Sequence, residues 1–195
     1  MARPSEFDRD EAVASAIRVF ARHGYEAAST SALMAGMGIG RQSLYGAFGD
    51  KRRLFLEALR RYSDGSLAEM NAALAADGPA PEAIEAALLV GLGSAEDLET
   101  GCLGVGSIVE FSRSDPEVNA LNDAAAALVV AAFAARVRGG IAAGAFDPGL
   151  DPEAAGRLLL TLRSGLKVAA RGGAGEGELR EMARLALRGL RQLSV

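Results

Sequence analysis

Four side chains that can form hydrogen bonds to the bases or phosphates of a nucleic acid lie close together in the sequence: Arg41, Gln42, Ser43 and Tyr45. An arginine can pair with O6 and N7 of guanine, and a glutamine with N6 and N7 of adenine, in the major groove. Serine and tyrosine hydroxyls suit contacts to phosphate, which hold a protein in register on DNA. The pattern therefore predicts direct contact with double-stranded DNA.

The elements around these residues predict a helix-turn-helix. Two short helices, at about 29–37 and 41–47, are joined by glycine-rich residues, and Gly40 precedes the second helix. Leu44 and Phe48 lie four residues apart and can face a core, which leaves the polar residues and Gly46 on the other sides. In DNA-binding versions of this motif the second helix enters the major groove. An ordinary helical hairpin within a bundle is the alternative.

The next helix begins with three cations, Lys51, Arg52 and Arg53, after Asp50 as the expected N-cap. Cations at a helix N-terminus oppose the helix dipole, at about 0.3–1 kcal/mol each. Their presence is explained if a DNA phosphate binds there, with Lys51 as the main contact. For Arg52 and Arg53, simple solvation is the alternative.

Apolar residues recur at helical spacing along the whole chain, whereas strand signals are nearly absent. The fold is therefore predicted to be all-α, with about nine helices in total. Asp-Pro pairs at 115–116 and 151–152 predict an N-cap followed by proline at the first helical position. Beyond residue 75 we expect helices at about 82–93, 102–112, 116–143, 152–172 and 176–193. The predicted domains are residues 1–50, which contain the helix-turn-helix, and residues 51–195, which form a further helical domain.

Composition restricts the function classes. The net charge is −4, but residues 1–65 carry ten basic and eight acidic residues, or +2, and the remaining eleven and seventeen give −6. This asymmetry is consistent with two modules that have different partners. The longest apolar run, residues 124–135, is shorter than the roughly 18 residues of a membrane span. With no secretion signal apparent and a single cysteine, Cys102, we expect a cytoplasmic protein without membrane association.

An enzyme is not expected. The chain has one histidine, His23, near the end of the first expected helix, where capping is its expected role. No second histidine can complete a metal site with it, and a Ser/His/acid set is not expected from a single histidine at a helix end. We predict no metal and no cofactor. A helical interaction protein that binds no DNA would leave Arg41, Gln42 and Lys51 unexplained.

Residues 7–62 resemble the N-terminal domain of TetR-family (TetR/AcrR-type) transcriptional regulators. The resemblance implies a three-helix DNA-binding domain whose third helix reads DNA, with Tyr45 and Lys51 on phosphates and Arg41, Gln42 and Gly46 at base-reading positions. Ser29, Thr30 and Ser43 complete the expected DNA-binding set. Gly36, inside the second helix, departs from the family pattern and costs about 1 kcal/mol relative to alanine. The residues that carry the resemblance are Ala16, Phe20, "GY" at 24–25, Ser29, Leu33, "GIGRQSLYGAFGDK" at 38–51 and "LF" at 54–55.

The resemblance also implies a homodimer whose second domain binds a small-molecule effector, with repression as the family default. The predicted dimer interface comprises Leu158, Leu162, Leu166, Met182 and Leu190, with Ala186 not assigned. The alternative is that the chain's own helical bundle covers these apolar faces. The predicted effector site, for a small apolar molecule, comprises Cys102, Val105, Ile108, Phe111, Leu128 and Phe133.

Two residues of the second domain have alternative interpretations. Cys102 is either a reactive sensor of oxidants or electrophiles, because a helix N-terminus lowers a thiol pKa, or an inert buried residue. Glu110 is either a ligand-anchoring carboxylate, which we favour, or a surface residue.

Overall fold

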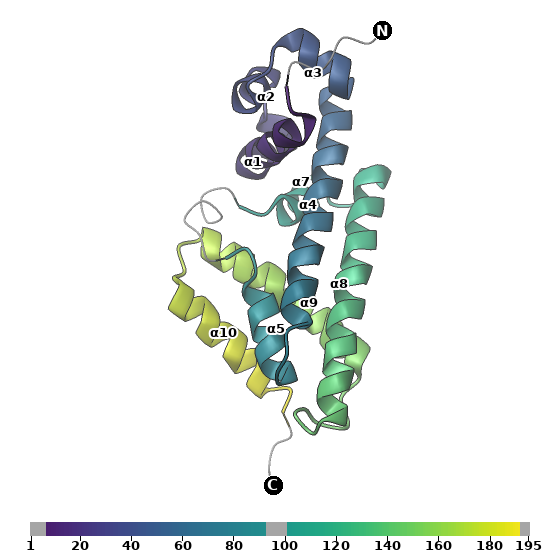
Figure 1. Ribbon diagram of the computed structural model, residues 1–195, viewed down its shortest axis with the longest axis vertical. Helices are drawn as coiled ribbons and strands as arrows, with labels where there is room; N and C mark the ends of the chain where they lie inside the picture. Colours follow the sequence, from purple (N-terminus) through teal and green to yellow (C-terminus); the bar gives the residue numbers. More distant parts are fainter. Residues whose placement is uncertain (1–6, 93–100, 192–195) are drawn as a thin grey trace. The chain divides into compact units, whose positions relative to one another are not determined.

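The computed structural model describes residues 7–92 and 101–191, and every regular element within them is an α-helix (Figure 1). The all-α prediction is therefore confirmed. The helices are α1 (Arg9–Ala27), α2 (Thr30–Met37), α3 (Arg41–Phe48), α4 (Lys51–Leu74), α5 (Ala80–Leu89), α7 (Leu103–Phe111), α8 (Pro116–Ala142), α9 (Pro152–Arg171) and α10 (Glu176–Arg188).

Side-chain caps fix where several of these helices begin. Ser29, Asp50, Asp115 and Asp151 each accept a hydrogen bond from a backbone N–H two or three residues further on, at 2.8–3.1 Å. Each bond satisfies an N–H group that the first helical turn leaves without a partner. The caps expected at Asp50 and at both Asp-Pro pairs are confirmed.

Three helix ends differ from what the sequence indicates. A glycine after an apolar helical run is a common C-cap, but α1 continues through Gly24 to Ala27 with a kink at that glycine, whose φ is 77°. α5 ends at Leu89 because Val90 leaves the helical region, and residue 93 of the predicted helix lies outside the described residues. α10 ends at Arg188, where the Gly189 N–H turns back onto carbonyls of the last turn.

The chain divides into two compact units. The first unit comprises residues 1–63 and 100–122, and the second comprises residues 64–99 and 123–195. The divisions after residues 63 and 122 fall inside long helices, α4 and α8, and neither coincides with the predicted boundary after Asp50. The first unit also includes α7, which packs on α1.

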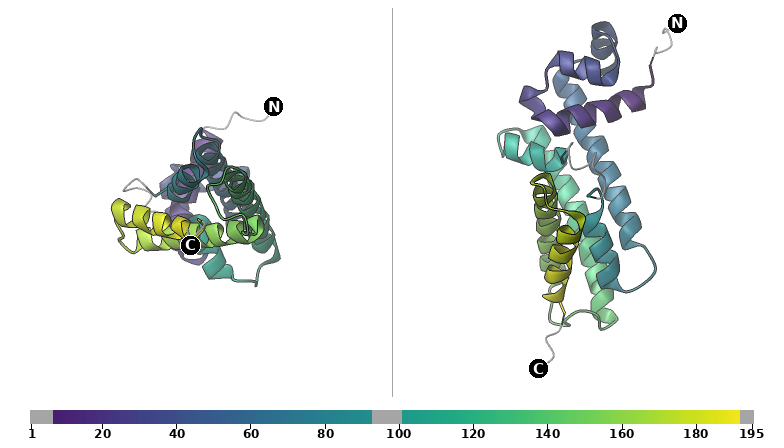
Figure 2. Two further views of the ribbon diagram at one scale, coloured as in Figure 1. Left: turned by 90° about the horizontal axis from the view of Figure 1, so that it is seen from below. Right: turned by 90° about the vertical axis from the view of Figure 1, so that its left-hand side faces the viewer.

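An aromatic cluster forms the centre of the first unit. The Phe55 ring lies 5.1 Å from Phe20, 4.9 Å from Tyr25 and 5.4 Å from Phe111, measured between ring centroids. These residues come from α4, α1 and α7, and such aromatic pairs add about 0.5–1.5 kcal/mol each beyond area burial. Figures 1 and 2 show α1, α2 and α3 gathered around the N-terminal part of α4. The cluster thereby supports the helices that carry the predicted DNA-reading residues.

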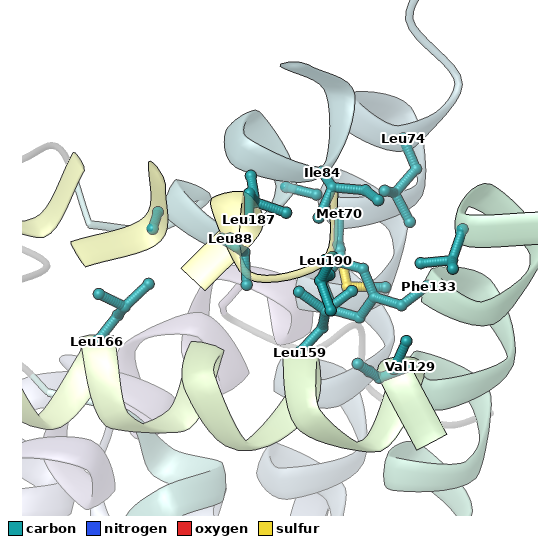
Figure 3. Packing of buried hydrophobic residues seen from close by; sticks show 14 of the residues in the cluster. Met70, Leu74, Ile84, Leu88, Val129, Phe133, Leu159, Leu166, Leu187 and Leu190 are labelled. Carbon is teal, nitrogen blue, oxygen red and sulfur yellow. The ribbon is translucent and has the colours of Figure 1, made fainter. Parts of the chain in front are cut away.

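The second unit has its own apolar core, in which α5, α9 and α10 pack on one another. Figure 3 shows side chains of α4, α5, α8, α9 and α10 converging there. The residues drawn and labelled are Met70, Leu74, Ile84, Leu88, Val129, Phe133, Leu159, Leu166, Leu187 and Leu190, all of them buried.

α8 is the most apolar long helix among the described residues. An 18-residue window in it has a mean hydropathy of 1.6, and by length and composition alone this would suffice to cross a membrane. Only 22% of that window is buried inside the structure. Two of its buried side chains pack in the apolar cores of the protein itself, Val118 in the first unit and Phe133 in the second. The helix also carries Arg136, whose guanidinium donates to the Gly78 carbonyl at 2.8 Å.

Candidate nucleic-acid interface

The second helix of the helix-turn-helix, α3, has one buried and one exposed side. Leu44 and Phe48 are 0% and 5% exposed and fix α3 to the core of the first unit. On the opposite side Arg41, Gln42 and Gly46 are exposed, Ser43 is half-buried, and Tyr45 is 43% exposed. The structure therefore brings the polar residues predicted at α3 together on one solvent-facing surface.

Glycines set how closely α2 and α3 can approach their neighbours. Gly38 ends α2 in the left-handed region, with φ 66°, and its N–H donates to the Met34 carbonyl. A Cβ on Gly36 would lie 2.6 Å from Cγ2 of Val19 in α1, so a glycine there permits close α1–α2 packing. A Cβ on Gly46 would meet nothing within 4 Å. Gly36 is thus explained by packing, whereas packing gives no reason for Gly46.

Ser29 and Thr30 lie at the N-terminus of α2. The Ser29 hydroxyl accepts a hydrogen bond from the Ala32 N–H at 3.1 Å and shares a second one with the Ser31 hydroxyl at 2.8 Å. Ser29 is exposed and Thr30 is half-buried. Ser29 therefore has a structural role as the cap of α2, beside its predicted contact with DNA.

Lys51, at the first position of α4, is held by residues at the end of α1. Its Nζ donates to the Glu26 carbonyl at 3.2 Å and lies 4.6 Å from the centroid of the Tyr25 ring. An ammonium over an aromatic face contributes about 0.5–1 kcal/mol at such a half-exposed position. Burial also raises the pKa of the Tyr25 phenol, so this ring stays neutral under the ammonium at physiological pH.

Arg52 points to a different partner. Its guanidinium binds both carboxylate oxygens of Asp115, with Nη2 3.0 Å from Oδ1, and it also pairs with Glu117 at the start of α8. The hydrogen bonds that Arg52 donates to Asp115 and Glu117 raise the pKa of Arg52. The bonds that Asp115 accepts from Arg52 lower the pKa of Asp115 to about 2 from an ordinary 3.8. The alternative of a merely solvated Arg52 is therefore wrong.

Arg53 differs from Arg52, because its side chain is 77% exposed and has only a 3.8 Å contact with Asp50. Solvation remains an adequate description of Arg53. The pairing of Arg52 with residues more than 60 positions away had no signal in the sequence.

Glu110 has a partner that the sequence did not indicate. Its Oε2 accepts the Tyr25 N–H and its Oε1 accepts the Glu26 N–H, both at 2.7 Å. These amides follow the kink at Gly24, where an added Cβ would lie 2.8 Å from Oε2. Glu110 is exposed and its carboxylate binds backbone amides of the first unit, so the structure favours the surface-residue alternative over a ligand anchor.

Cys102 forms the N-cap of α7. Its Sγ accepts hydrogen bonds from the Tyr62 hydroxyl at 3.1 Å and from the Val105 N–H at 3.4 Å. The thiol is half-buried. Within residues 7–92 and 101–191, no group of three or more His, Cys, Asp and Glu side chains is arranged to hold a metal ion.

The six residues predicted for an effector site are divided between the two units. Cys102, Val105, Ile108 and Phe111 belong to the first unit, and Leu128 and Phe133 belong to the second. Phe111 packs on Tyr25 and Phe55, and Phe133 is 0% exposed in the core. Ile108 and Leu128 are 55% and 54% exposed. The two phenylalanines thus have a core role in their own units.

The residues predicted for a dimer interface also separate by burial. Leu158 and Met182 are exposed, whereas Leu162 and Ala186 are half-buried. Leu166 and Leu190 are 1% and 5% exposed and pack in the core of the second unit, so we remove them from the predicted interface. Their apolar character reflects the core of the chain itself. Two residues that the prediction omitted, Val168 and Leu185, are 57% and 63% exposed.

The chain is similar to known bacterial transcriptional regulators. The family model "Bacterial regulatory proteins, tetR family" matches residues 12–58. The uncharacterized HTH-type transcriptional regulator YezE of Bacillus subtilis is 38% identical over 120 residues, which span 60% of this chain and 62% of YezE. The HTH-type transcriptional repressor ComR of Escherichia coli is 31% identical over 119 residues, 60% of this chain and 57% of ComR. Both alignments thus span less than two thirds of these relatives.

Among solved structures, a cysteine mutant of the TetR family transcriptional regulator CifR, complexed with 26-base-pair operator DNA, is 34% identical to this chain. The match covers 95% of this chain and 98% of CifR, with a TM-score of 0.79. A helix-turn-helix whose second helix has an exposed polar side, as here, is the arrangement found in helix-turn-helix DNA-binding proteins. With these matches, the chain belongs to the TetR family.

Proposed function

We propose that this chain is a cytoplasmic repressor, with no enzymatic activity, that binds a palindromic operator as a homodimer and leaves it in response to an effector. The observation that carries the proposal is the polar, solvent-facing side of α3 above buried Leu44 and Phe48. Packing within the chain does not account for this surface, whereas contact with base edges does. The operator complex of the relative CifR supports the same role.

Within this proposal the side chains divide into two groups. Arg41 and Gln42, exposed at the start of α3, read base edges, and Gly46 lets the DNA approach closely. Phosphate contacts come from the hydroxyls of Ser43 and Tyr45 and from the Lys51 ammonium. Ser29 and Thr30 add the N-terminus of α2, whose free N–H groups favour an anion.

The exposed apolar side chains of α9 and α10 support the proposed homodimer. Leu158 and Val168 on α9 and Met182 and Leu185 on α10 are between 43% and 63% exposed. A second copy would cover them, and a two-fold axis would match a palindromic operator. A Cβ on Gly165, between the two α9 residues, would meet nothing within 4 Å, which leaves room for a partner helix.

For the release signal we propose a small apolar molecule or a thiol-reactive compound. Within the first unit, exposed Ile108 and half-buried Val105 support the first. The second, with Cys102 as the reactive group, is favoured by the place of its sulfur at the N-terminus of α7, where the helix dipole stabilises a thiolate.

Operator binding by variants tests the DNA assignment. With a palindrome selected from random sequences, Arg41→Ala should cost about 1–3 kcal/mol and relax preference at one base pair in each half-site. Tyr45→Phe, which removes only a hydroxyl, should weaken all sequences alike, as expected for a phosphate contact. Arg53→Ala is the matched control for loss of an exposed cation. Uniform loss on all sequences for Arg41→Ala would make Arg41 a phosphate contact and contradict its assignment to base reading.

A further inference from the structure

We infer that Glu110 is a positioning residue for DNA binding: it holds the backbone at residues 25–26, and that backbone holds the Lys51 ammonium against the DNA. The inference rests on the proposed phosphate contact of Lys51. It gives α7 a part in operator affinity, although α7 lies far along the chain from the helix-turn-helix.

The first step is the pair of hydrogen bonds between the Glu110 carboxylate and the end of α1. One carboxylate binds two successive backbone amides, those of Tyr25 and Glu26, at 2.7 Å each. Hydrogen bonds to an ionised acceptor are about twice as strong as neutral ones. Gly24 makes the approach possible, because its φ of 77° turns the chain and a Cβ there would lie 2.8 Å from Oε2. The geometry is that of an anion seated on paired N–H groups, with Glu110 supplying the anion.

The second step runs from this backbone to Lys51. Residues 25 and 26, whose N–H groups bind Glu110, also hold the ammonium, through the Glu26 carbonyl at 3.2 Å and the Tyr25 ring at 4.6 Å. Lys51 has three N–H donors, so the bond to Glu26 leaves others to meet a phosphate. A lysine fixed before binding loses less side-chain entropy when it contacts DNA.

The third step concerns α7 itself, which carries Cys102 as its N-cap and Glu110 in its last turn. A change at the cap that shifts or unwinds α7 would withdraw the carboxylate from residues 25–26. The same helix can therefore connect the candidate signal site with the DNA contact inside the first unit.

A double-mutant cycle tests the inference. Glu110→Gln keeps the size of the side chain but presents an NH₂ group to one of the two amides. Operator affinity, measured by fluorescence anisotropy, should fall by about two- to thirtyfold in the otherwise unchanged protein. In a Lys51→Ala background the same substitution should change affinity less than about twofold, because the group it positions is gone.

The sign of the effect separates positioning from charge. Removing a carboxylate from a DNA-binding unit should by itself strengthen DNA binding, and Glu11→Gln, an exposed acid in the same unit, measures that baseline. Glu110→Asp keeps the charge but shortens the reach, so it should also weaken binding. Urea unfolding of each variant verifies that it is folded at the assay temperature.

Two results would overturn the inference: an equal loss for Glu110→Gln in both backgrounds, or affinity at or above that of Glu11→Gln. Failure of the underlying proposal looks different. In that case Lys51→Ala itself would leave operator affinity and its salt dependence unchanged.

Discussion

Gly36 and Gly46 lie in the two helices of the helix-turn-helix, and we expect alanine at these positions to have opposite effects on stability. Both are helical glycines, and each costs about 0.8–1 kcal/mol relative to alanine by propensity alone. A Cβ on Gly46 meets nothing within 4 Å, whereas a Cβ on Gly36 lies 2.6 Å from Cγ2 of Val19. The intrinsic gain is therefore available at Gly46 and opposed by a clash at Gly36.

The magnitudes follow from these two distances. Gly46→Ala should raise the free energy of unfolding by about 0.5–1 kcal/mol, since nothing offsets the propensity gain. At Gly36 the branched side chain of Val19 has few rotamers to retreat into, and overpacking of this kind costs about 1–3 kcal/mol. After the propensity gain is subtracted, Gly36→Ala should lower stability by up to about 2 kcal/mol.

Urea unfolding followed by circular dichroism measures both variants, and operator binding is measured on the same samples. In the proposed interface Gly46 faces DNA, so Gly46→Ala should be more stable and yet bind the operator more weakly. A shift of both variants in the same direction would refute the packing argument. A stabilised Gly46→Ala protein with unchanged affinity for every operator sequence would remove Gly46 from the interface.

Three further predictions address other parts of the chain. Leu158→Glu combined with Leu185→Glu should give monomers in size-exclusion chromatography with light scattering; wild-type protein that is monomeric at micromolar concentration would contradict the proposed dimer. The lowered pKa of Asp115 means that its bond with Arg52 stabilises the fold above about pH 4 and that this contribution is lost as the pH falls towards 2. Asp115→Asn should flatten that part of a urea-stability profile against pH, and an unchanged profile would refute this. Cys102→Ser should stay on the operator when an electrophile releases the wild type, whereas unchanged release would assign the signal to a noncovalent ligand.

Much of the fold could be predicted because its signals are local. Helical periodicity and capping residues such as Asp115 and Asp151 involve neighbours within four positions, and the helices they predicted are present. The end of α1 could not be predicted in this way. Gly24 is a normal C-cap signal, but the chain resumes its helix beyond it, where Glu110, more than 80 residues away, accepts the next two N–H groups.

The candidate site shows the same contrast between local and distant effects. The exposed face of α3 follows from the spacing of Leu44 and Phe48, which the sequence displays directly. The partners of Arg52 and Glu110 depend on how α7 and α8 return to the first unit, and no spacing rule encodes that. Burial of Leu166 and Leu190 was missed for a related reason: an apolar helix face looks the same whether its own chain or a second copy covers it.

The first unit is built from two separate stretches of sequence, residues 1–63 and 100–122. An exchange of DNA-binding heads between regulators, by recombination or by protein engineering, would therefore have to transfer both stretches. A graft of the first alone would place Phe55 and Tyr25 against foreign side chains where Phe111 now packs, and would leave two amides without Glu110. Chimeras that keep residues 100–122 with their native DNA-binding head should stay folded. In such chimeras α7 and Cys102 would be transferred together with the residues that determine operator specificity, and not with the second unit.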